Sequence, residues 1–183
     1  MSLPAPALVS WEDFLALPED DPRELLDGLL VEMDMPTRPH ERAVAALIVV
    51  LGTWAELHKA EILASAYRVR GRRDRGFMPD VQLYFADNPA ERAEQGLEAG
   101  RPDLVVEVIS PSKARYDRVT KVQAYAEMGI PEYWLVDPAA RTLERLVLRG
   151  DIYAIEQNAQ EDEVFEPRSL PGLSFSLARL WVP

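Results

Sequence analysis

The chain has 183 residues, a length that suits one compact domain with a sizeable core rather than two. It contains no cysteine, which excludes disulfide scaffolds, cysteine-ligated metal sites and thiol nucleophiles. Its formal net charge of −11 makes it a poor non-specific binder of DNA, because its average field repels phosphate. Contact with a nucleic acid would therefore require a local basic patch or bound cations.

The apolar stretches of the chain do not indicate a membrane protein. The longest wholly apolar run covers residues 43–51 and is too short to cross a bilayer. The first residues do not combine a basic stretch with a following apolar one, so we expect no signal peptide. On these grounds we expect a soluble protein of the cytoplasm.

The first half of the chain predicts helices and short strands. Ser10 has capping-box spacing to Asp13 and predicts a short helix that ends at Pro18. Residues 24–32 read as two short strands around an Asp-Gly turn. A long helix is expected over residues 41–58, after two prolines that break the chain. Its buried stripe consists of Val44, Leu47, Ile48, Leu51 and Trp54.

The second half predicts most of a sheet. Strands are expected at 66–70, 80–85, 103–109 and 133–136, and a hairpin from 142–148 and 151–156. Residues 86–101 read as a surface loop with a helical piece. A helix is expected from 113 to 128, with Gly129 directly after it. The order of these elements favours a single α/β or α+β domain over residues 1–183, built on a mixed sheet.

Glu107 is the most informative residue of the sequence. It lies inside the run Leu-Val-Val-Glu-Val-Ile, which is apolar on both faces and predicts a central strand. A carboxylate there is costly to bury unless it is paired or coordinates a cation. Two interpretations follow, namely a structural salt bridge to an arginine or a metal-binding carboxylate.

A metal site needs a second carboxylate, and two Pro-Asp pairs offer one. Asp103 is on the same strand as Glu107, about 13 Å away at 3.3 Å per residue, which is too far to share an ion. Asp80 begins the preceding strand and would lie beside Glu107 if the two strands are antiparallel. We therefore choose Asp80 and interpret Asp103 as a turn residue.

Lys121 can supply a cation to this pair. If its helix folds back along the sheet, Lys121 lies about 12–14 Å back from the turn, and Glu107 lies at a similar distance along its strand. The two side chains can then meet. The alternative is a simple helical ion pair between Asp117 and Lys121 at i,i+4 spacing.

Other charged residues carry weaker indications. His40 begins the long helix and either caps it or lies near the metal site, and Glu24 and Glu41 are candidate extra acids. An arginine-rich turn leads directly to Asp80, and arginine forks suit phosphate oxygens, although a turn that simply faces water has the same composition. The candidate DNA contacts in this turn are Arg68, Arg70, Arg72, Arg73 and Arg75.

Several motifs together resemble the Uma2 family of restriction-endonuclease-like bacterial proteins. They are RELLDGLLVEM, His40, FMPDV, the long stretch from RPDLVVEVISPSK to EYWLVDP, and SLPGLSF. The resemblance implies the PD-(D/E)XK nuclease fold, a mixed sheet flanked by helices. It equates Pro79-Asp80 with the PD pair and Glu107 with the following acid. The lysine position two residues later holds Ile109, so Lys121 would have to act from the helix instead.

The resemblance implies a metal-dependent endonuclease that hydrolyses DNA phosphodiester bonds. Asp80 and Glu107 would hold Mg²⁺ or Mn²⁺, and Lys121 would orient water or stabilise developing charge. The alternative is an inactive nuclease-like fold that acts as a dimeric interaction or regulatory module, an interpretation favoured by the acidity of the chain and by Ile109. We expect a homodimer only because it is the commonest soluble assembly.

Overall fold

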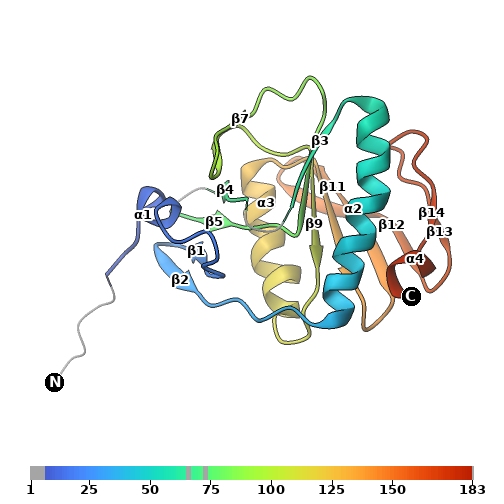
Figure 1. The fold of residues 1–183 in the computed structure, drawn as a ribbon, viewed down its shortest axis with the longest axis horizontal. Helices are drawn as coiled ribbons and strands as arrows, with labels where there is room; N and C mark the ends of the chain where they lie inside the picture. The colour runs from blue at the N-terminus through green and yellow to red at the C-terminus, as the bar shows by residue number, and fades with distance from the viewer. Residues whose placement is uncertain (1–6, 65–66, 72–73, 183) are drawn as a thin grey trace.

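A six-stranded mixed sheet forms the centre of the protein (Figure 1). The computed structural model describes residues 7–64, 67–71 and 74–182. The strand order is β12-β11-β10-β9-β6-β3, and the pair β9–β10 is parallel while the other neighbours are antiparallel. The strands are β3 (Glu61–Ala64), β6 (Val81–Tyr84), β9 (Leu104–Val108), β10 (Glu132–Asp137), β11 (Thr142–Arg149) and β12 (Ile152–Gln160). The predicted mixed-sheet α+β class is confirmed.

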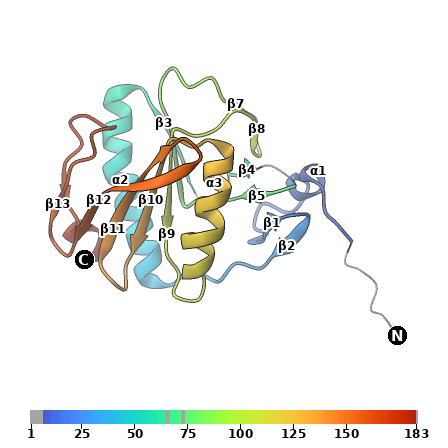
Figure 2. The ribbon, with the colours of Figure 1, turned by 180° about the vertical axis from the view of Figure 1, so that it is seen from behind.

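Helices cover both faces of this sheet (Figures 1 and 2). The long helix α2 (Arg38–His58) packs on one face with its apolar stripe. On the other face lies a helical segment that starts as the π-helix η1 (Tyr116–Lys121) and continues as α3 (Val122–Met128). Because both faces are covered, all five residues of the central strand β9 are buried. This arrangement explains why Glu107 lies within an otherwise apolar run.

A second, four-stranded sheet lies beside the first, in the order β2-β1-β5-β4. It consists of β1 (Glu24–Leu26), β2 (Leu29–Val31), β4 (Val69–Arg70) and β5 (Gly76–Phe77), and the short helix α1 (Trp11–Leu15) packs against it. Ser10 and Asp13 form the predicted capping box of α1. Gly76 is required here, because a Cβ at this position would lie 2.5 Å from the ring of Phe14.

The remaining elements lie at the edges. Strands β7 (Glu91–Arg92) and β8 (Leu97–Ala99) form a small hairpin. The C-terminal part adds β13 (Val164–Phe165), β14 (Phe175–Ser176) and the short helix α4 (Ala178–Trp181), which packs beside α2. No helix in the described part of the chain is long and apolar enough to cross a membrane.

Some predicted boundaries were wrong. The long helix begins at Arg38 rather than at residue 41, because Pro39 fits in its first turn, where an amide hydrogen has no helical partner. Ile48 is exposed, at the edge of a stripe that is otherwise buried as predicted. Residues 86–101 contain the β7–β8 hairpin and no helix. The strand expected at 66–70 is reduced to β4, residues 65–66 lie outside the described residues, and the sequence did not predict β3, which ends just before them.

Candidate active site

The pairing of β6 with β9 brings Asp80 next to Glu107. The two strands are antiparallel, as predicted, and Val81 pairs with Val106, so the residue before Val81 lies beside the residue after Val106. Asp80 Oδ2 accepts a hydrogen bond of 2.7 Å from the backbone amide of Val108. The carboxylate of Asp80 is thus fixed at the end of β9 that carries Glu107.

Strand alternation decides which way Glu107 points. Val106 and Val108 belong to the core under α2, whereas Val105 and Ile109 belong to the core under α3. Glu107 therefore faces the α3 side, as period-two alternation requires. Ile109 shares that side and belongs to a buried cluster with aromatic side chains. The position at which the family resemblance implies a lysine therefore holds an apolar core residue.

Lys121 reaches Glu107 from the helix. Its Nζ lies 2.9 Å from Glu107 Oε1, 3.0 Å from Glu24 Oε1 and 3.7 Å from Asp117 Oδ1, and the lysine is only 2% exposed. Tyr125 donates a further hydrogen bond of 2.6 Å to Glu107 Oε1. The cation beside Glu107 is thus a lysine and not the arginine of the structural interpretation. The alternative Asp117–Lys121 pair also forms, so the two predicted contacts of Lys121 coexist.

The π-helix η1 contributes two of these side chains. Asp117 and Lys121 are both buried and point toward the sheet from this segment. A π-helix closes each turn with an extra residue and is frequent at functional sites. Nothing in the apolar pattern of residues 113–128 distinguishes it from an ordinary α-helix. The sequence therefore predicted a helix here and missed its π-helical start.

Glu24 is a member of the site that the sequence raised only as a possible extra acid. It is buried at the beginning of β1, and its Oε1 accepts a hydrogen bond of 3.0 Å from the amide of Met78. Its other oxygen, Oε2, is buried without a hydrogen-bond partner. Because β1 belongs to the second sheet, only the tertiary fold brings Glu24 to Lys121. Its position on a short strand gave no signal for this contact.

His40 lies at the other side of Asp80. Its Nε2 is 3.4 Å from Asp80 Oδ2, and its Nδ1 is 3.4 Å from Glu41 Oε1. Burial on its own lowers the pKa of His40, but the hydrogen bond and negative charge of Asp80 outweigh it and raise that pKa. Of the two interpretations of His40, the structure favours the position near the acidic pair.

The buried charges of this cluster do not balance. The carboxylates of Glu24, Glu107 and Asp117 surround the one ammonium group of Lys121, and the partly buried carboxylate of Asp80 lies beside Glu107. Burial raises the pKa of Glu107 well above its usual value, and the neighbouring carboxylates add to this effect against the opposing charge of Lys121. Burial likewise raises the pKa of Asp117, to about 6. The excess negative charge is relieved either by protons or by a bound cation.

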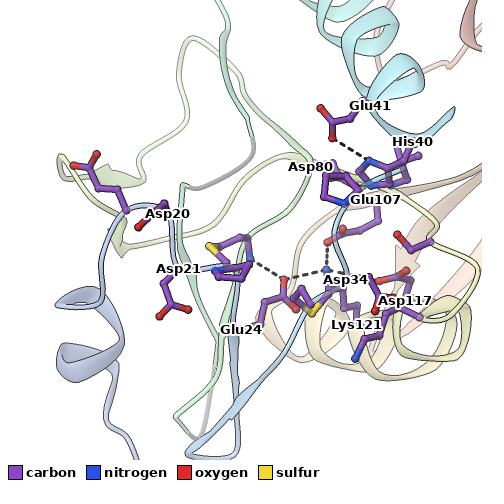
Figure 3. Close-up of a pocket in the computed structure, with 18 residues that line it drawn as sticks. Asp20, Asp21, Glu24, Asp34, His40, Glu41, Asp80, Glu107, Asp117 and Lys121 are labelled. Atoms are coloured by element: carbon purple, nitrogen blue, oxygen red, sulfur yellow. Dashed lines mark hydrogen bonds and ion pairs between the residues drawn. The ribbon is translucent and has the colours of Figure 1, made fainter. Parts of the chain in front are cut away.

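These side chains line a pocket of about 300 Å³ between the two sheets (Figure 3). Glu24, Glu107 and Asp117 come together from β1, β9 and η1, Asp80 lies just before β6 and Glu41 at the start of α2, whereas Asp20 and Asp21 lie on a loop at the edge. Nine carboxylates line the pocket, against two lysines and one histidine. The acidic residues are Glu19, Asp20, Asp21, Glu24, Asp34, Glu41, Asp80, Glu107 and Asp117.

The pocket offers carboxylate oxygens as ligands but not a complete set of metal ligands. Among the described residues, no group of three His, Asp or Glu side chains stands arranged to hold a metal ion. However, in the same residues no hydrogen-bond donor reaches Asp80 Oδ1 or Glu107 Oε2, and Glu24 Oε2 is buried without a partner. Mg²⁺ and Mn²⁺ prefer such oxygens and commonly use only one or two protein carboxylates. The donor set therefore fits a divalent cation.

The predicted arginine contacts with DNA do not form one exposed surface. Arg68 is buried and donates hydrogen bonds to three backbone carbonyls after α1, so it holds α1 in place rather than facing a phosphate. Arg75 pairs with Asp27 and Glu127. Arg70 is half exposed beside Trp11. The other two, Arg72 and Arg73, lie outside the described residues.

Asp103 has the turn role that its position predicted. Its Oδ2 accepts hydrogen bonds of 2.7 Å from the Phe85 amide and from Asn88 Nδ2. These bonds join the end of β6 to the beginning of β9. The pocket does not include Asp103, so the second Pro-Asp pair is structural in this fold.

The comparisons with known proteins agree with this geometry. A sequence profile of the Uma2 family, described as "Putative restriction endonuclease", matches residues 11–178. The chain belongs to the Uma2 family. One solved structure, from Anabaena variabilis and titled a putative nuclease belonging to DUF820, is 20% identical, with a TM-score of 0.75. The alignment covers 94% of this Uma2 chain and 97% of that one, so the two share a fold. No curated protein matches the chain.

Proposed function

We propose that this Uma2 protein is a metal-dependent endonuclease that hydrolyses phosphodiester bonds of DNA. The observation that carries the proposal is the position of Asp80 beside Glu107 across β6 and β9, with Lys121 on the same acidic pocket. Asp80 and Glu107 would hold Mg²⁺ or Mn²⁺. When bound, the ion supplies a more acidic water and offsets negative charge on the phosphate.

The residues of the chain have distinct tasks in this reaction. In hydrolysis, a water oxygen bonds to phosphorus, the bond to the leaving sugar oxygen breaks, and that oxygen takes up a proton. Lys121 keeps Glu107 in place and brings a positive charge to the pocket where the phosphate gains charge. The amide of Val108 orients Asp80. His40 contacts Asp80 and can hold or release a proton near neutral pH.

The acidity of the pocket supports a cation-dependent reaction. Its carboxylates would repel a phosphodiester without a bound cation, because like charges face each other across a short distance. A divalent ion removes this repulsion. The departure at Ile109 does not argue against activity, since Lys121 reaches the same carboxylate from η1.

Nicking of supercoiled plasmid DNA in Mg²⁺ or Mn²⁺ tests the proposal. The wild type should cut, and Asp80→Asn and Glu107→Gln should each reduce the rate about a thousandfold, because each loses several kcal/mol of transition-state stabilisation. Asp20→Asn is the matched control, since it changes an exposed carboxylate at the pocket edge and should cut normally.

Thermal unfolding with and without Mn²⁺ gives a second readout. A site that binds the ion stabilises the folded state, so the midpoint of the wild type should rise and that of Asp80→Asn should rise less. If the wild type neither nicks DNA nor gains stability with either metal, the inactive interaction module is the correct interpretation. We keep the homodimer as a prediction, which sedimentation equilibrium would test.

A further inference from the structure

An arginine-lined groove beside the acidic pocket has no role in the site described above. It runs along one side of α2 to α4, and it is lined by Arg38, Glu41, Arg42, Ala45, Ala46, Val49 and Arg179. Glu41 also lines the acidic pocket, so the groove and the pocket meet at the first turn of α2. Figure 1 shows α4 beside this part of α2.

The arginines of this groove differ from most others in the protein. Arg38, Arg42 and Arg179 have no ion-pair partner among the described residues, although the chain has 31 acidic side chains for 20 basic ones. Eight other arginines form ion pairs, namely Arg23, Arg70, Arg75, Arg92, Arg118, Arg141, Arg145 and Arg149. In so acidic a chain, three arginines without ion pairs, against the single carboxylate of Glu41 in the same groove, make a local basic patch.

The side chains of the groove are arranged for a polyanion. Arg38 and Arg42 are four residues apart on α2, about 6 Å along the helix axis, and Arg179 faces them from α4. Arg42 is partly buried, and its Nε is buried without a hydrogen-bond partner among the described residues. Duplex DNA carries a negative charge every 1.7 Å or so of its axis, which is dense enough for neighbouring arginines to engage successive phosphates.

We propose that this groove binds the sugar–phosphate backbone of the duplex whose scissile bond lies in the acidic pocket. The inference rests on the proposed nuclease function and names the surface that holds its substrate. The groove is a DNA contact in addition to the turn before Asp80, in which Arg68 and Arg75 are engaged within the protein. A DNA strand that leads from the groove into the acidic pocket would pass Glu41 and reach Asp80.

A matched pair of double variants tests the groove. Arg38→Gln/Arg179→Gln removes two exposed arginines from it, and Arg101→Gln/Arg168→Gln removes two exposed, unpaired arginines elsewhere in the described part of the chain. Both variants change the formal net charge from −11 to −13, so only the position of the lost charges differs. Binding of a fluorescent DNA duplex is measured by anisotropy at several salt concentrations. Ca²⁺ is added to occupy the acidic pocket in place of Mg²⁺, because both ions take oxygen ligands.

The groove variant should bind about 30-fold more weakly than the wild type at about 150 mM salt, because each lost phosphate contact removes about 0.9 from the slope of log K against log salt concentration. The slope should fall by about 1.8, and the control should keep the wild-type slope and midpoint of unfolding. Equal loss of affinity in both variants would refute the proposal that the groove binds DNA. A wild type that does not bind duplex DNA would refute it as well.

The outcome separates the groove from the nuclease proposal. If the wild type nicks plasmid DNA but the groove variant binds as tightly as the control, the groove is wrong and the nuclease proposal stands. If only the groove variant loses affinity while the wild type fails to nick, the groove stands as a DNA-binding surface and the nuclease proposal is wrong.

Discussion

Replacing Lys121 by methionine tests the charge balance on which the site depends. The ammonium group lies within 3.0 Å of Glu107 and Glu24 and is 2% exposed, so its removal leaves buried carboxylates without a counter-charge. Removing one partner of a buried ion pair costs about 3–5 kcal/mol. In a domain of this length that corresponds to a fall of roughly 6–20 °C in the unfolding midpoint.

The loss should depend on pH in a defined direction. Without Lys121, the folded-state pKa values of Glu107 and Asp117 rise further above their values in the unfolded chain, because burial and mutual repulsion are no longer opposed by its positive charge. Raised carboxyl pKa values mean that the folded state binds more protons, so stability falls as pH rises above about 4. The variant should therefore lose much more stability at pH 8 than at pH 5.

Calorimetry or thermal unfolding with and without Mn²⁺ provides the assay. Mn²⁺ should raise the midpoint of Lys121→Met at least as much as that of the wild type, because the ion meets more uncompensated charge. Adding Glu107→Gln should recover part of the lost stability, since it removes one of the buried carboxylates that lack a counter-charge. Lys113→Met is the control, because Lys113 lines the same pocket, forms no ion pair with the described residues and should change stability by about 0.5 kcal/mol or less. A variant as stable as the wild type at pH 8 would refute the reasoning.

Three further predictions concern neighbouring groups. Mn²⁺ affinity should increase between pH 5 and 7, measured by titration calorimetry, because Asp117, whose pKa is raised to about 6, loses its proton over this range and adds negative charge to the pocket; a flat profile would contradict this. His40→Gln should cost stability mainly below pH 6.5, because the His40–Asp80 contact raises the pKa of His40 and its contribution is lost as pH rises through that pKa; urea unfolding at several pH values would show it. Arg145→Met should lower the free energy of unfolding by about 3–5 kcal/mol, because it leaves the buried carboxylate of Glu132 without its ion-pair partner. The Mn²⁺-induced rise in the unfolding midpoint should stay unchanged.

The sequence predicted the parts of the site that follow from one strand and its neighbour. An acid within an apolar run identified Glu107, and the antiparallel order of two adjacent strands placed Asp80 beside it. Helical rise and strand rise together predicted that Lys121 could reach Glu107, which the structure confirms. These arguments need only local geometry, because β6, β9 and η1 follow one another closely in the chain, with only the small β7–β8 hairpin between the first two.

The parts that the sequence missed depend on contacts between distant elements. Glu24 reaches the pocket only because the small sheet lies against the large one. Arg68 lies in an arginine-rich turn, but its burial depends on the position of α1, more than fifty residues earlier. Arg179 lies more than 130 residues after Arg38 and Arg42, so the arginines of the groove form no run in the sequence. Composition cannot distinguish arginines that hold the protein together from those that face a ligand.

Placing the positive charge on a helix rather than on the strand has an evolutionary consequence. The acids Asp80 and Glu107 are fixed by the hydrogen-bonded ladder of the sheet, whereas Lys121 depends on the wide turns of η1. Deleting one residue from η1 would rotate the following side chains by about 100° and turn Lys121 away from the acids, with the strands undisturbed. Relatives with the same fold can thus gain or lose this lysine through a one-residue slip in a helix, independently of the residues that build the sheet.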